Sequence, residues 1–510
     1  MHSTGPLLTL GTLSAIVSSA AGAQQASLDF NASAPPLGYV LPSYLSINLD
    51  SGSLYQNFDF DDGPFTALVS HLVAAAPTEF RIGGGAADSV VFTGAAGASG
   101  NCSSTLPNVN ICVSAESWDA IARFCQRTGL GLMFDLNAAL RVDAASPWNS
   151  TNAQQLLNWA AAAPARGLPV PAGFQLGNEP QDWYKRHPQL NVKGAQLAAD
   201  YHSLRALLRA QFGSQPPAIH GPDACCEDRR PILADFAAHV AGALDALTVH
   251  AYPLPRTAND SCIPAAYTNK SAMLGVVAAV RSYQASAAPL LASGVPLILG
   301  ETATSAHGGC DGLSNRFVSG FTFMLELGTL GEVGVAQINR QDVAGFSSNT
   351  EPSNYALLGP PGWSRGPLGQ PHPDYYVALL WKRLVGTRVL ASSLQAAAPL
   401  LERVDAHVWC ASGASAGSLV VTFFSMADAA TPLALPPGVP AAPRVEYVLT
   451  SSALDSNDAY LNGVLLVAGD DGSLPPMGGQ RIPAGGAAIS LPPWSYGFMV
   501  LEGASAGACR

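Results

Sequence analysis

Eight short apolar runs, each ending in a polar or glycine-rich turn, recur along the first two thirds of the chain. Their apolar residues follow one another with little alternation, which is typical of strands buried on both faces of a parallel sheet. Segments with apolar residues at helical spacing, such as 115–128, 195–211 and 316–327, separate most of the runs. The predicted strands cover residues 44–50, 79–84, 131–137, 173–179, 218–223, 246–252, 296–301 and 334–341.

This alternation predicts an α/β protein built on a (β/α)8 TIM barrel, which occupies residues 44–384. A doubly wound open sheet is the alternative that the pattern leaves open. Such a sheet more naturally carries a glycine-rich phosphate-binding loop after its first strand, and none follows Asp50. We therefore expect the sheet to close.

The pattern changes after Pro373, where a last helix over 374–384 is followed by short β-rich runs. Pro/Gly clusters separate these runs, which predicts a C-terminal antiparallel β-sandwich over residues 385–510. Residues 24–43 precede the first barrel strand and could add a strand to that sandwich.

The N-terminal segment 1–23 resembles a signal peptide. Residues 7–17 are largely apolar, too few to span a bilayer, and Ala21-Gly22-Ala23 offers a small-residue cleavage site. Because no Lys or Arg precedes the apolar run, an Ala-rich tail is the alternative. Five glycosylation patterns also favour secretion, to the extracellular space, the cell wall or a lysosome- or vacuole-like compartment, and they begin at Asn31, Asn101, Asn149, Asn259 and Asn269.

Charge and cysteine content narrow the possible partners. The net charge is −11 with only four lysines, so the chain lacks the basic field that attracts nucleic acid or heavily sulfated polymers. No later stretch is long and apolar enough for a transmembrane segment. The nine cysteines of an exported chain indicate disulfides with one thiol left over, and none of their spacings predicts a metal site. Cys102 and Cys112 could staple the loop between them.

A barrel of this type carries its reactive groups at the C-terminal ends of the strands. Two carboxylates stand out there, because Glu179 and Glu301 each follow an apolar strand through a glycine. A glutamate that caps a helix or pairs with an arginine is the alternative for each. The polar residues at the predicted strand ends are Asp50, Arg81, Asn137, Asn178, Glu179, Asp223, His250, Tyr252, Glu301 and Gln341.

Two carboxylates across a barrel mouth suit the cleavage of a glycosidic bond. One protonates the leaving oxygen, while the other attacks the anomeric carbon or activates water. A separation of about 5 Å predicts retention of configuration, and about 6.5–9.5 Å predicts inversion.

The motifs around these residues resemble those of clan A retaining glycosidases, and within that clan the heparanase-like β-glucuronidases, glycoside hydrolase family 79. The similarity runs from about residue 40 to the C-terminus, in family order. Its main motifs are Leu45-Ser-Ile-Asn-Leu-Asp50, Phe80-Arg-Ile-Gly-Gly84, Gly177-Asn-Glu-Pro180 with Lys185, His220-Gly-Pro-Asp223, Gly300-Glu-Thr302, His307-Gly-Gly309, Asn339-Arg-Gln341, Asn354-Tyr355 and Pro373-Asp-Tyr-Tyr376.

The resemblance implies a role for each matched residue. Glu179 would be the acid/base, Glu301 the nucleophile, and Asn178 the partner of the substrate 2-hydroxyl. Two backbone N–H groups, of Gly308 and Gly309, and the Tyr355 hydroxyl would hold a glucuronate carboxylate. The remaining substrate contacts would be Asp50, Lys185, Tyr252 and Gln341, whereas His250 and Arg81 would hold the mouth together.

The resemblance further implies no cofactor and a Cys410–Cys509 disulfide that ties the sandwich together. The implied activity is retaining hydrolysis of β-linked glucuronic acid in oligo- or polysaccharides. The chain departs from the family pattern at His307, where an aromatic residue is frequent, and its basic clusters, Lys185-Arg186 and Arg229-Arg230, are few. A less charged glycan than heparan sulfate, such as an arabinogalactan side chain, therefore fits better.

Two other functions stay open on the sequence. One is a clan A glycosidase with a different sugar specificity, which would not need the Gly308, Gly309 and Tyr355 anion pocket. The other is a non-catalytic glycan-binding barrel, which would not need both Glu179 and Glu301.

Overall fold

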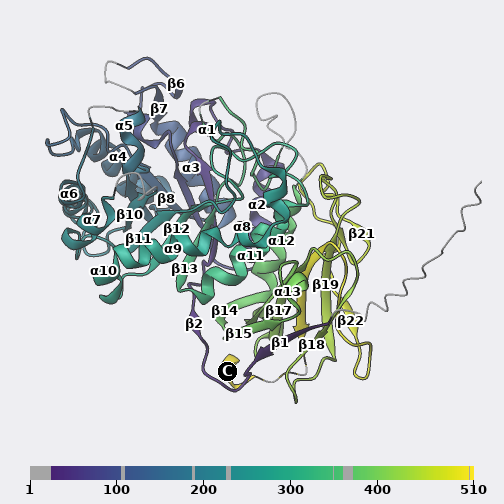
Figure 1. Cartoon of the computed structure of the whole chain (residues 1–510). Helices are drawn as coiled ribbons and strands as arrows, with labels where there is room; N and C mark the ends of the chain where they lie inside the picture. The colour runs from purple at the N-terminus through teal and green to yellow at the C-terminus, as the bar shows by residue number, and fades with distance from the viewer. Residues whose placement is uncertain are drawn as a thin grey trace, which may run out of the picture.

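The computed structural model describes residues 25–104, 109–186, 190–225, 231–348, 350–359, 371–502, 504 and 506–510. The predicted signal peptide and the Arg229-Arg230 pair therefore lie outside the described residues. A barrel, coloured purple to teal, packs against a β-rich part coloured green to yellow (Figure 1). Among the described helices, none combines the length and the apolar character that a membrane crossing requires.

Eight parallel strands close into the barrel, which confirms the predicted fold class and excludes the open sheet. Each strand pairs with the next in chain order, and the last pairs with the first, with Ile338 opposite Leu45. In order around the barrel they are β3 (Leu45–Asp50), β4 (Glu79–Gly83), β8 (Gly131–Leu136), β9 (Gly173–Leu176), β10 (Ala218–Ala224), β11 (Ala246–His250), β12 (Leu297–Thr302) and β13 (Val335–Arg340).

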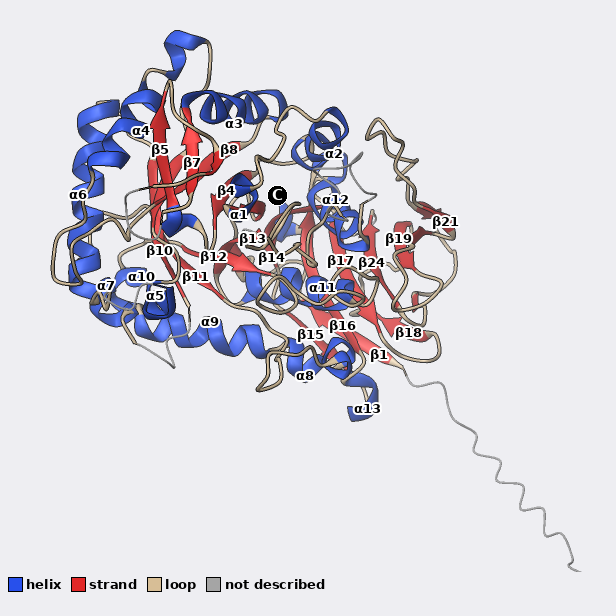
Figure 2. Ribbon diagram, turned by 90° about the horizontal axis from the view of Figure 1, so that it is seen from above, coloured by secondary structure: helices blue, strands red, loops and turns tan. Residues whose placement is uncertain are grey.

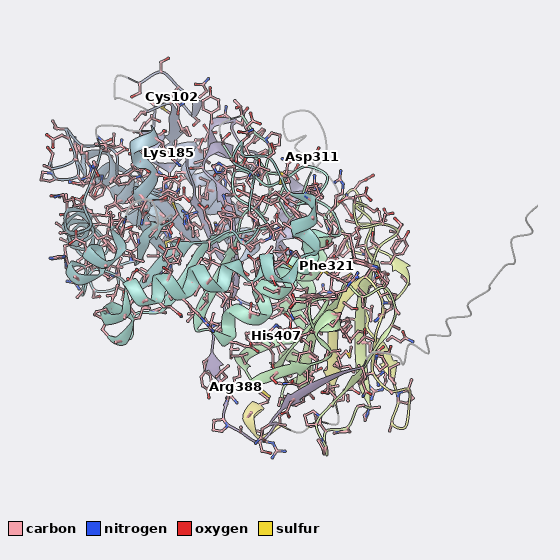
Figure 3. All side chains as sticks on the ribbon, in the orientation of Figure 1. Cys102, Lys185, Asp311, Phe321, Arg388 and His407 are labelled. Atoms are coloured by element: carbon pink, nitrogen blue, oxygen red, sulfur yellow. A yellow bond between two sulfur atoms is a disulfide. The ribbon has the colours of Figure 1, made fainter. Side chains whose placement is uncertain are left out.

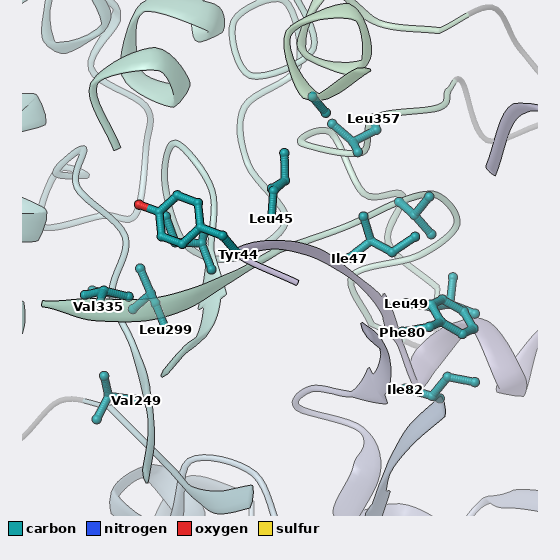
Figure 4. Close-up of a cluster of buried hydrophobic side chains, with 14 of the residues drawn as sticks. Tyr44, Leu45, Ile47, Leu49, Phe80, Ile82, Val249, Leu299, Val335 and Leu357 are labelled. Carbon is teal, nitrogen blue, oxygen red and sulfur yellow. The ribbon is translucent and has the colours of Figure 1, made fainter. Parts of the chain in front are cut away.

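The strands are buried along nearly their whole length, as their continuous apolar runs predict. Ile47, Phe80 and Leu299 are at most 1% exposed and belong to one large apolar cluster, part of which Figure 4 shows. Helices surround the strands in the view from above (Figure 2). The longer ones are α2 (Gly63–Val73), α3 (Ala115–Thr128), α4 (Thr151–Ala161), α6 (Gly194–Phe212), α7 (Leu233–His239), α9 (Gly275–Ser286), α11 (Ser319–Glu332) and α12 (Pro373–Leu384).

Local sequence signals set several helix ends. The Asp62 side chain accepts a hydrogen bond from the Phe65 N–H at the start of α2, and Ser114 does the same for Ser117 in α3. Gly129 ends α3 in the left-handed conformation that favours glycine. Shorter helices are α1 (Gly52–Tyr55), α5 (Trp183–Arg186), α8 (Lys270–Met273), α10 (Ala288–Ala292) and α13 (Ala398–Leu401).

A three-stranded sheet lies beside α3 and α4, with β7 (Ile111–Ser114) between β5 (Val90–Gly94) and β6 (Gly100–Asn101). A disulfide joins Cys102 to Cys112 there, with 5.8 Å between their Cα atoms.

Two sheets form the second part of the molecule. The smaller sheet has the order β15-β1-β18-β23 and includes β1 (Ala26–Phe30), so the N-terminal segment does contribute a strand. Its other strands are β15 (Ser392–Gln395), β18 (Thr431–Ala434) and β23 (Ser490–Leu491). The larger sheet contains β2 (Gly38–Tyr39), β14 (Val385–Val389), β16 (Val404–Ala411), β17 (Leu419–Ser425), β24 (Ser495–Leu501), β19 (Arg444–Thr450), β20 (Tyr460–Leu461), β21 (Val464–Leu465) and β22 (Gln480–Ile482).

The two parts share α11, which packs on the barrel and on β16, β17 and β24. The predicted helix 316–327 thus begins and ends later than expected, at Ser319–Glu332. Because α11 is buried on nearly all sides, the spacing of its apolar residues does not show where the helix begins and ends. Phe321 contacts Tyr496 at 5.3 Å between ring centroids, and Figure 3 shows Phe321 and His407 near this seam.

Candidate active site

A pocket of about 750 Å³ opens at the C-terminal ends of the barrel strands. It brings together nine of the ten residues that the sequence pointed to as catalytic or substrate-binding. These are Asp50, Asn178, Glu179, Lys185, Tyr252, Glu301, Gly308, Gln341 and Tyr355. Gly309 is buried beside the pocket and is not one of its lining residues.

Glu179 follows β9 in a constrained turn. Its φ of 49° is left-handed, and its N–H donates to the Asp223 carbonyl at 3.1 Å. Gly177, at φ 77°, precedes it where a Cβ would meet Ala138 and the Trp183 ring at 2.6 Å. Only glycine fits there without displacing a neighbour. The Glu179 side chain remains 22% exposed to the pocket.

Glu301 lies on β12 and is held more tightly. Its Oε1 accepts from Arg81 at 2.8 Å, and its Oε2 accepts from the Tyr252 hydroxyl at 2.8 Å. Its side chain is 7% exposed. Both oxygens are therefore held in a fixed direction by hydrogen bonds.

The two carboxylates lie close together. One oxygen of Glu179, one nitrogen of His250 and one oxygen of Glu301 all lie within 4.8 Å of one another. So close an approach of their oxygens leaves little room between them for the water molecule that an inverting pair must accommodate.

Arg81 contributes a buried guanidinium group to the site. Its guanidinium, fully buried, donates to Glu301, to Asn178 at 2.8 Å, and to Asp223 at 2.9 Å. Burial alone would lower its pKa, but the charges of Asp223 and Glu301 raise the pKa well above its usual value. Arg81 therefore stays cationic and holds both Glu301 and Asn178 in place.

His250 contacts both catalytic candidates. Its Nδ1 lies 3.1 Å from Glu179 and 3.6 Å from Glu301, and its Nε2 lies 3.3 Å from Asp223. Burial lowers the pKa of His250, but Glu301, Asp223 and Glu179 outweigh it and raise that pKa to about 10. We therefore assign His250 as an imidazolium at neutral pH, which balances part of the carboxylate charge.

Three further acids surround this centre, and sequence reasoning gave none of them a role. Burial raises the pKa of Asp135 and of Asp342, the latter with help from Asp50. Asp223 is also fully buried, yet Arg81 and His250 hold its pKa below its usual range. The sequence had already placed Asp223 at a predicted strand end, but without a role.

The opposite wall of the pocket is a loop after β12 in left-handed conformation. His307, Gly308 and Gly309 have φ values of 57°, 78° and 75°. The Gly309 N–H donates to the Ala306 carbonyl at 3.3 Å, whereas the Gly308 N–H has no hydrogen-bond acceptor within the described part of the chain. Tyr355 stacks on Tyr252 with 6.1 Å between ring centroids.

A disulfide holds this loop in place. Cys262 and Cys310 are joined, and Arg256 donates to the Ala306 carbonyl at 3.0 Å. The sequence gave no indication of this pairing, because the two cysteines follow different strands and are 48 positions apart. Cys125 and Cys225 carry buried thiols.

Lys185 stands on the far rim, on the short helix after Glu179. Its Nζ lies 2.6 Å from Asp182, so part of its charge is already balanced. Glu179, Asp182 and Cys225 form one group whose geometry could hold a metal ion, and Glu179, His250 and Glu301 form another. In the second group, the protonation of His250 and the bonds from Arg81 and Tyr252 disfavour metal binding.

A closed (β/α)8 barrel with paired carboxylates at the C-terminal mouth is an arrangement that glycoside hydrolases use. The family model described as Glycosyl hydrolase family 79, N-terminal domain, matches residues 52–328. The chain therefore belongs to glycosyl hydrolase family 79, the heparanase-like family of clan A, as the sequence motifs predicted.

Individual relatives agree with this assignment. The chain is 30% identical to heparanase of Mus musculus over 411 residues, which cover 78% of this chain and 71% of that protein. It is 26% identical to baicalin-beta-D-glucuronidase of Scutellaria baicalensis, over 88% of this chain and 85% of that protein. A solved 4-O-alpha-L-rhamnosyl-beta-D-glucuronidase from Fusarium oxysporum 12S has the same fold, with a TM-score of 0.62 at 14% identity, covering 93% of this chain and 100% of that one.

Proposed function

We propose that the chain is a secreted retaining β-glucuronidase that removes β-linked glucuronic acid from glycans by double displacement. The observation that carries the proposal is the pair of carboxylates with oxygens within 4.8 Å, one fixed and one open to the pocket. That asymmetry suits two different roles.

Glu301 is the nucleophile in this proposal. Arg81 and Tyr252 direct its two oxygens, so it attacks the anomeric carbon without first reorienting. Glu179 protonates the leaving oxygen in the same step. In the second step Glu179 removes a proton from water, which attacks the glycosyl–enzyme bond and releases Glu301.

The charge balance supports this sequence of events. His250 lies between the two carboxylates as a cation, and Arg81 adds a second positive charge beneath Glu301. As the glycosyl–enzyme bond neutralises Glu301, His250 still balances the charge that Glu179 acquires when it loses its proton.

The preference for a uronic acid rests on the pocket wall formed by Gly308 and Tyr355. A backbone N–H next to a phenolic hydroxyl offers two donors to a carboxylate. The name of the Scutellaria baicalensis relative, a β-D-glucuronidase, agrees with this preference.

A moderately charged glycan fits the rest of the pocket. Among the described lining residues Lys185 is the one lysine or arginine, and Asp182 already pairs with it. The pocket is also lined by small residues, which are Gly85, Ala86, Ser89, Ser347 and Ser348. We infer an aglycone that is neutral or sparsely sulfated.

Secretion is part of the same proposal. It rests on the apolar segment 7–17 with its small-residue cleavage site, and on the glycosylation patterns. The asparagines of all five patterns are exposed, as an acceptor in a folded secreted protein should be.

The test is release of 4-nitrophenol from a panel of aryl β-glycosides that includes the glucuronide, glucoside, galactoside and xyloside. We expect turnover of the glucuronide, with the β-anomer of glucuronic acid formed first in proton NMR. A first-formed α-anomer would contradict retention. Preference for a neutral sugar would favour a different clan A specificity, and no turnover of any glycoside would favour a glycan-binding barrel.

A further inference from the structure

A groove separate from the candidate active site lies between the barrel and the sandwich. It has a volume of about 510 Å³ and shares no lining residue with the active-site pocket. Its barrel side consists of Ala265 and residues 268–271, and its sandwich side consists of Glu402, Arg403 and Trp494. Figure 2 shows α8 next to α13 at this contact. This interdomain groove is within the range of about 300–1,000 Å³ that is usual for ligand sites.

Asn269 lines the interdomain groove and begins the glycosylation pattern Asn269-Lys270-Ser271. Its side-chain oxygen accepts from the Ala272 N–H at 3.1 Å and so caps α8. Its side-chain nitrogen, the atom to which a sugar would be attached, makes no hydrogen bond to the described part of the chain. The cap therefore fixes the side chain at the groove and leaves that nitrogen available.

The other two residues of the pattern are bonded to the sandwich. The Lys270 Nζ donates to the Val404 carbonyl at 2.8 Å, and the Ser271 hydroxyl donates to Glu402 at 3.2 Å. These bonds hold the start of α8 against the sandwich. A sugar on Asn269 would therefore begin where the two parts of the molecule meet.

Trp494 faces Asn269 from the sandwich side of the groove and has a constrained backbone. Its φ of 48° is left-handed, a region that bulky residues rarely occupy outside functional positions. Its indole N–H donates to Asp428 at 3.1 Å, and the Arg403 guanidinium lies 5.0 Å from its ring centroid. The side chain is partly exposed. Because its polar atom is already bonded, the exposed part of the indole offers mainly apolar surface.

The charged groups that line the groove already have partners. Lys270 pairs with Asp405 at 3.3 Å, Arg403 pairs with Asp428 at 3.0 Å, and Glu402 accepts from Ser271. An ionic ligand would have to compete with these pairs. A neutral polar group with one apolar face fits the groove better, and N-acetylglucosamine has this character.

We propose that Asn269 carries an N-linked glycan whose first sugars lie in the interdomain groove, against Trp494 and Arg403, and join the barrel to the sandwich. The inference rests on the secretion that is part of the proposed function. The attachment forms a bond between the Asn269 side-chain nitrogen and C1 of the first N-acetylglucosamine. The donor is a lipid-linked diphosphate oligosaccharide, so the lipid diphosphate leaves and the amide nitrogen loses one proton.

The covalent attachment favours this occupant over a free glycan. A tethered group has an effective concentration in the millimolar range, so weak contacts with Trp494 and Arg403 are sufficient to fill the groove. The sugar would add contacts across the interface that are present in the folded chain and absent from the unfolded one. The glycan should therefore raise the stability of the folded protein.

The experiment uses the full chain exported from a eukaryotic host by its own N-terminal segment. Glycopeptide mass spectrometry should find a glycan on Asn269. The Tm of wild type is then compared with that of Asn269→Asp, which prevents glycosylation and keeps an oxygen that caps α8. Asn31→Asp is the matched control, since Asn31 is exposed, does not line the groove and accepts from the Ser33 N–H in the same way.

We expect Asn269→Asp to lower Tm by about 2–4 °C and Asn31→Asp to lower it by less. Trp494→Leu removes the aromatic ring, and its own cost cancels in a double-mutant cycle. The Tm shift caused by Asn269→Asp should be clearly smaller in the Trp494→Leu background than in wild type. Glucuronide turnover is not part of this measurement.

An unmodified Asn269 in exported protein that carries glycan elsewhere would overturn the inference and leave the groove to a separate ligand. Equal Tm shifts for Asn269→Asp and Asn31→Asp, or an Asn269→Asp shift that is unchanged by Trp494→Leu, would overturn it as well. Failure of the chain to be exported would instead contradict the proposed secretion.

Discussion

Glu179 and Asp223 lie at the ends of neighbouring strands, and both have a left-handed backbone without being glycine, at φ 49° and 54°. The Glu179 N–H donates to the Asp223 carbonyl at 3.1 Å. The Asp223 side chain in turn accepts from Arg81 and lies 3.3 Å from His250. One residue therefore positions the backbone of the acid/base candidate and the cations that contact both carboxylates.

Asp223→Asn should lower kcat about 10- to 150-fold, because it removes the charge that orients Arg81 and His250 while keeping the side-chain shape. Steady-state kinetics on the aryl glucuronide measure the loss. Asp374→Asn is the matched control, since Asp374 pairs with Arg340 at 2.8 Å in an equally buried place outside the pocket. If the two variants lose stability alike and neither loses kcat, Asp223 does not position the site.

Tyr355→Phe should cost about 1.5–3 kcal/mol in kcat/KM on glucuronide, because one donor to a charged acceptor is removed. The ring and its stacking on Tyr252 remain, so turnover of the glucoside should hardly change. Equal losses on both substrates would show that Tyr355 does not recognise the carboxylate.

The interface between the barrel and the sandwich should lose stability at alkaline pH, because it contains the buried His407. His407 lies 3.0 Å from Glu332 and 3.5 Å from Asp405. Burial lowers the pKa of His407, but these two carboxylates outweigh it and raise the pKa to about 10. Because the folded-state pKa is raised, the stabilisation is fully present below about pH 6.5 and is lost as the pH rises through about 10.

Thermal unfolding of His407→Gln against wild type between pH 6 and pH 10.5 tests this. The difference in Tm should be largest at the acidic end and should shrink toward the alkaline end. His239→Gln is the control, since that ring is 55% exposed and should show little effect at any pH. A difference that grows with pH would contradict the assignment.

The sandwich should depend on the Cys410–Cys509 disulfide, which the structure forms with 5.4 Å between the Cα atoms. The bond closes a loop of 99 positions, for which chain entropy gives up to about 4.7 kcal/mol. Cys509→Ser should therefore lower Tm more than Cys102→Ser, whose loop spans 10 positions and is worth less than about 3 kcal/mol. A free, alkylated Cys509 in a non-reduced digest of wild type would refute the pairing.

The sequence was sufficient for the barrel because strands buried on both faces leave continuous apolar runs, and all eight runs became barrel strands. Glu179 and Glu301 could be found because a barrel places its strand ends at one mouth. Their separation could not, because it depends on the left-handed turn at Glu179 and on the bonds that direct Glu301.

Contacts across the barrel were the other part that could not be predicted. Arg81 and His250 were expected to hold the mouth together, but their direct contacts with Glu301 depend on side-chain packing between distant strands. The cysteine partner of Cys310 was missed because the spacing of cysteines along the chain does not determine which of them pair. The end of α11 was missed because the spacing of its apolar residues does not determine where the helix ends.

The most direct test of the account is covalent trapping of Glu301. A 2-deoxy-2-fluoro-β-D-glucuronosyl fluoride slows both steps of a retaining mechanism and lets the glycosyl–enzyme accumulate. Mass spectrometry of a peptic digest should then show one sugar per chain on the peptide that contains Glu301, and none in Glu301→Gln. A label on another residue, or glucuronide turnover close to wild type in Glu301→Gln, would contradict the account.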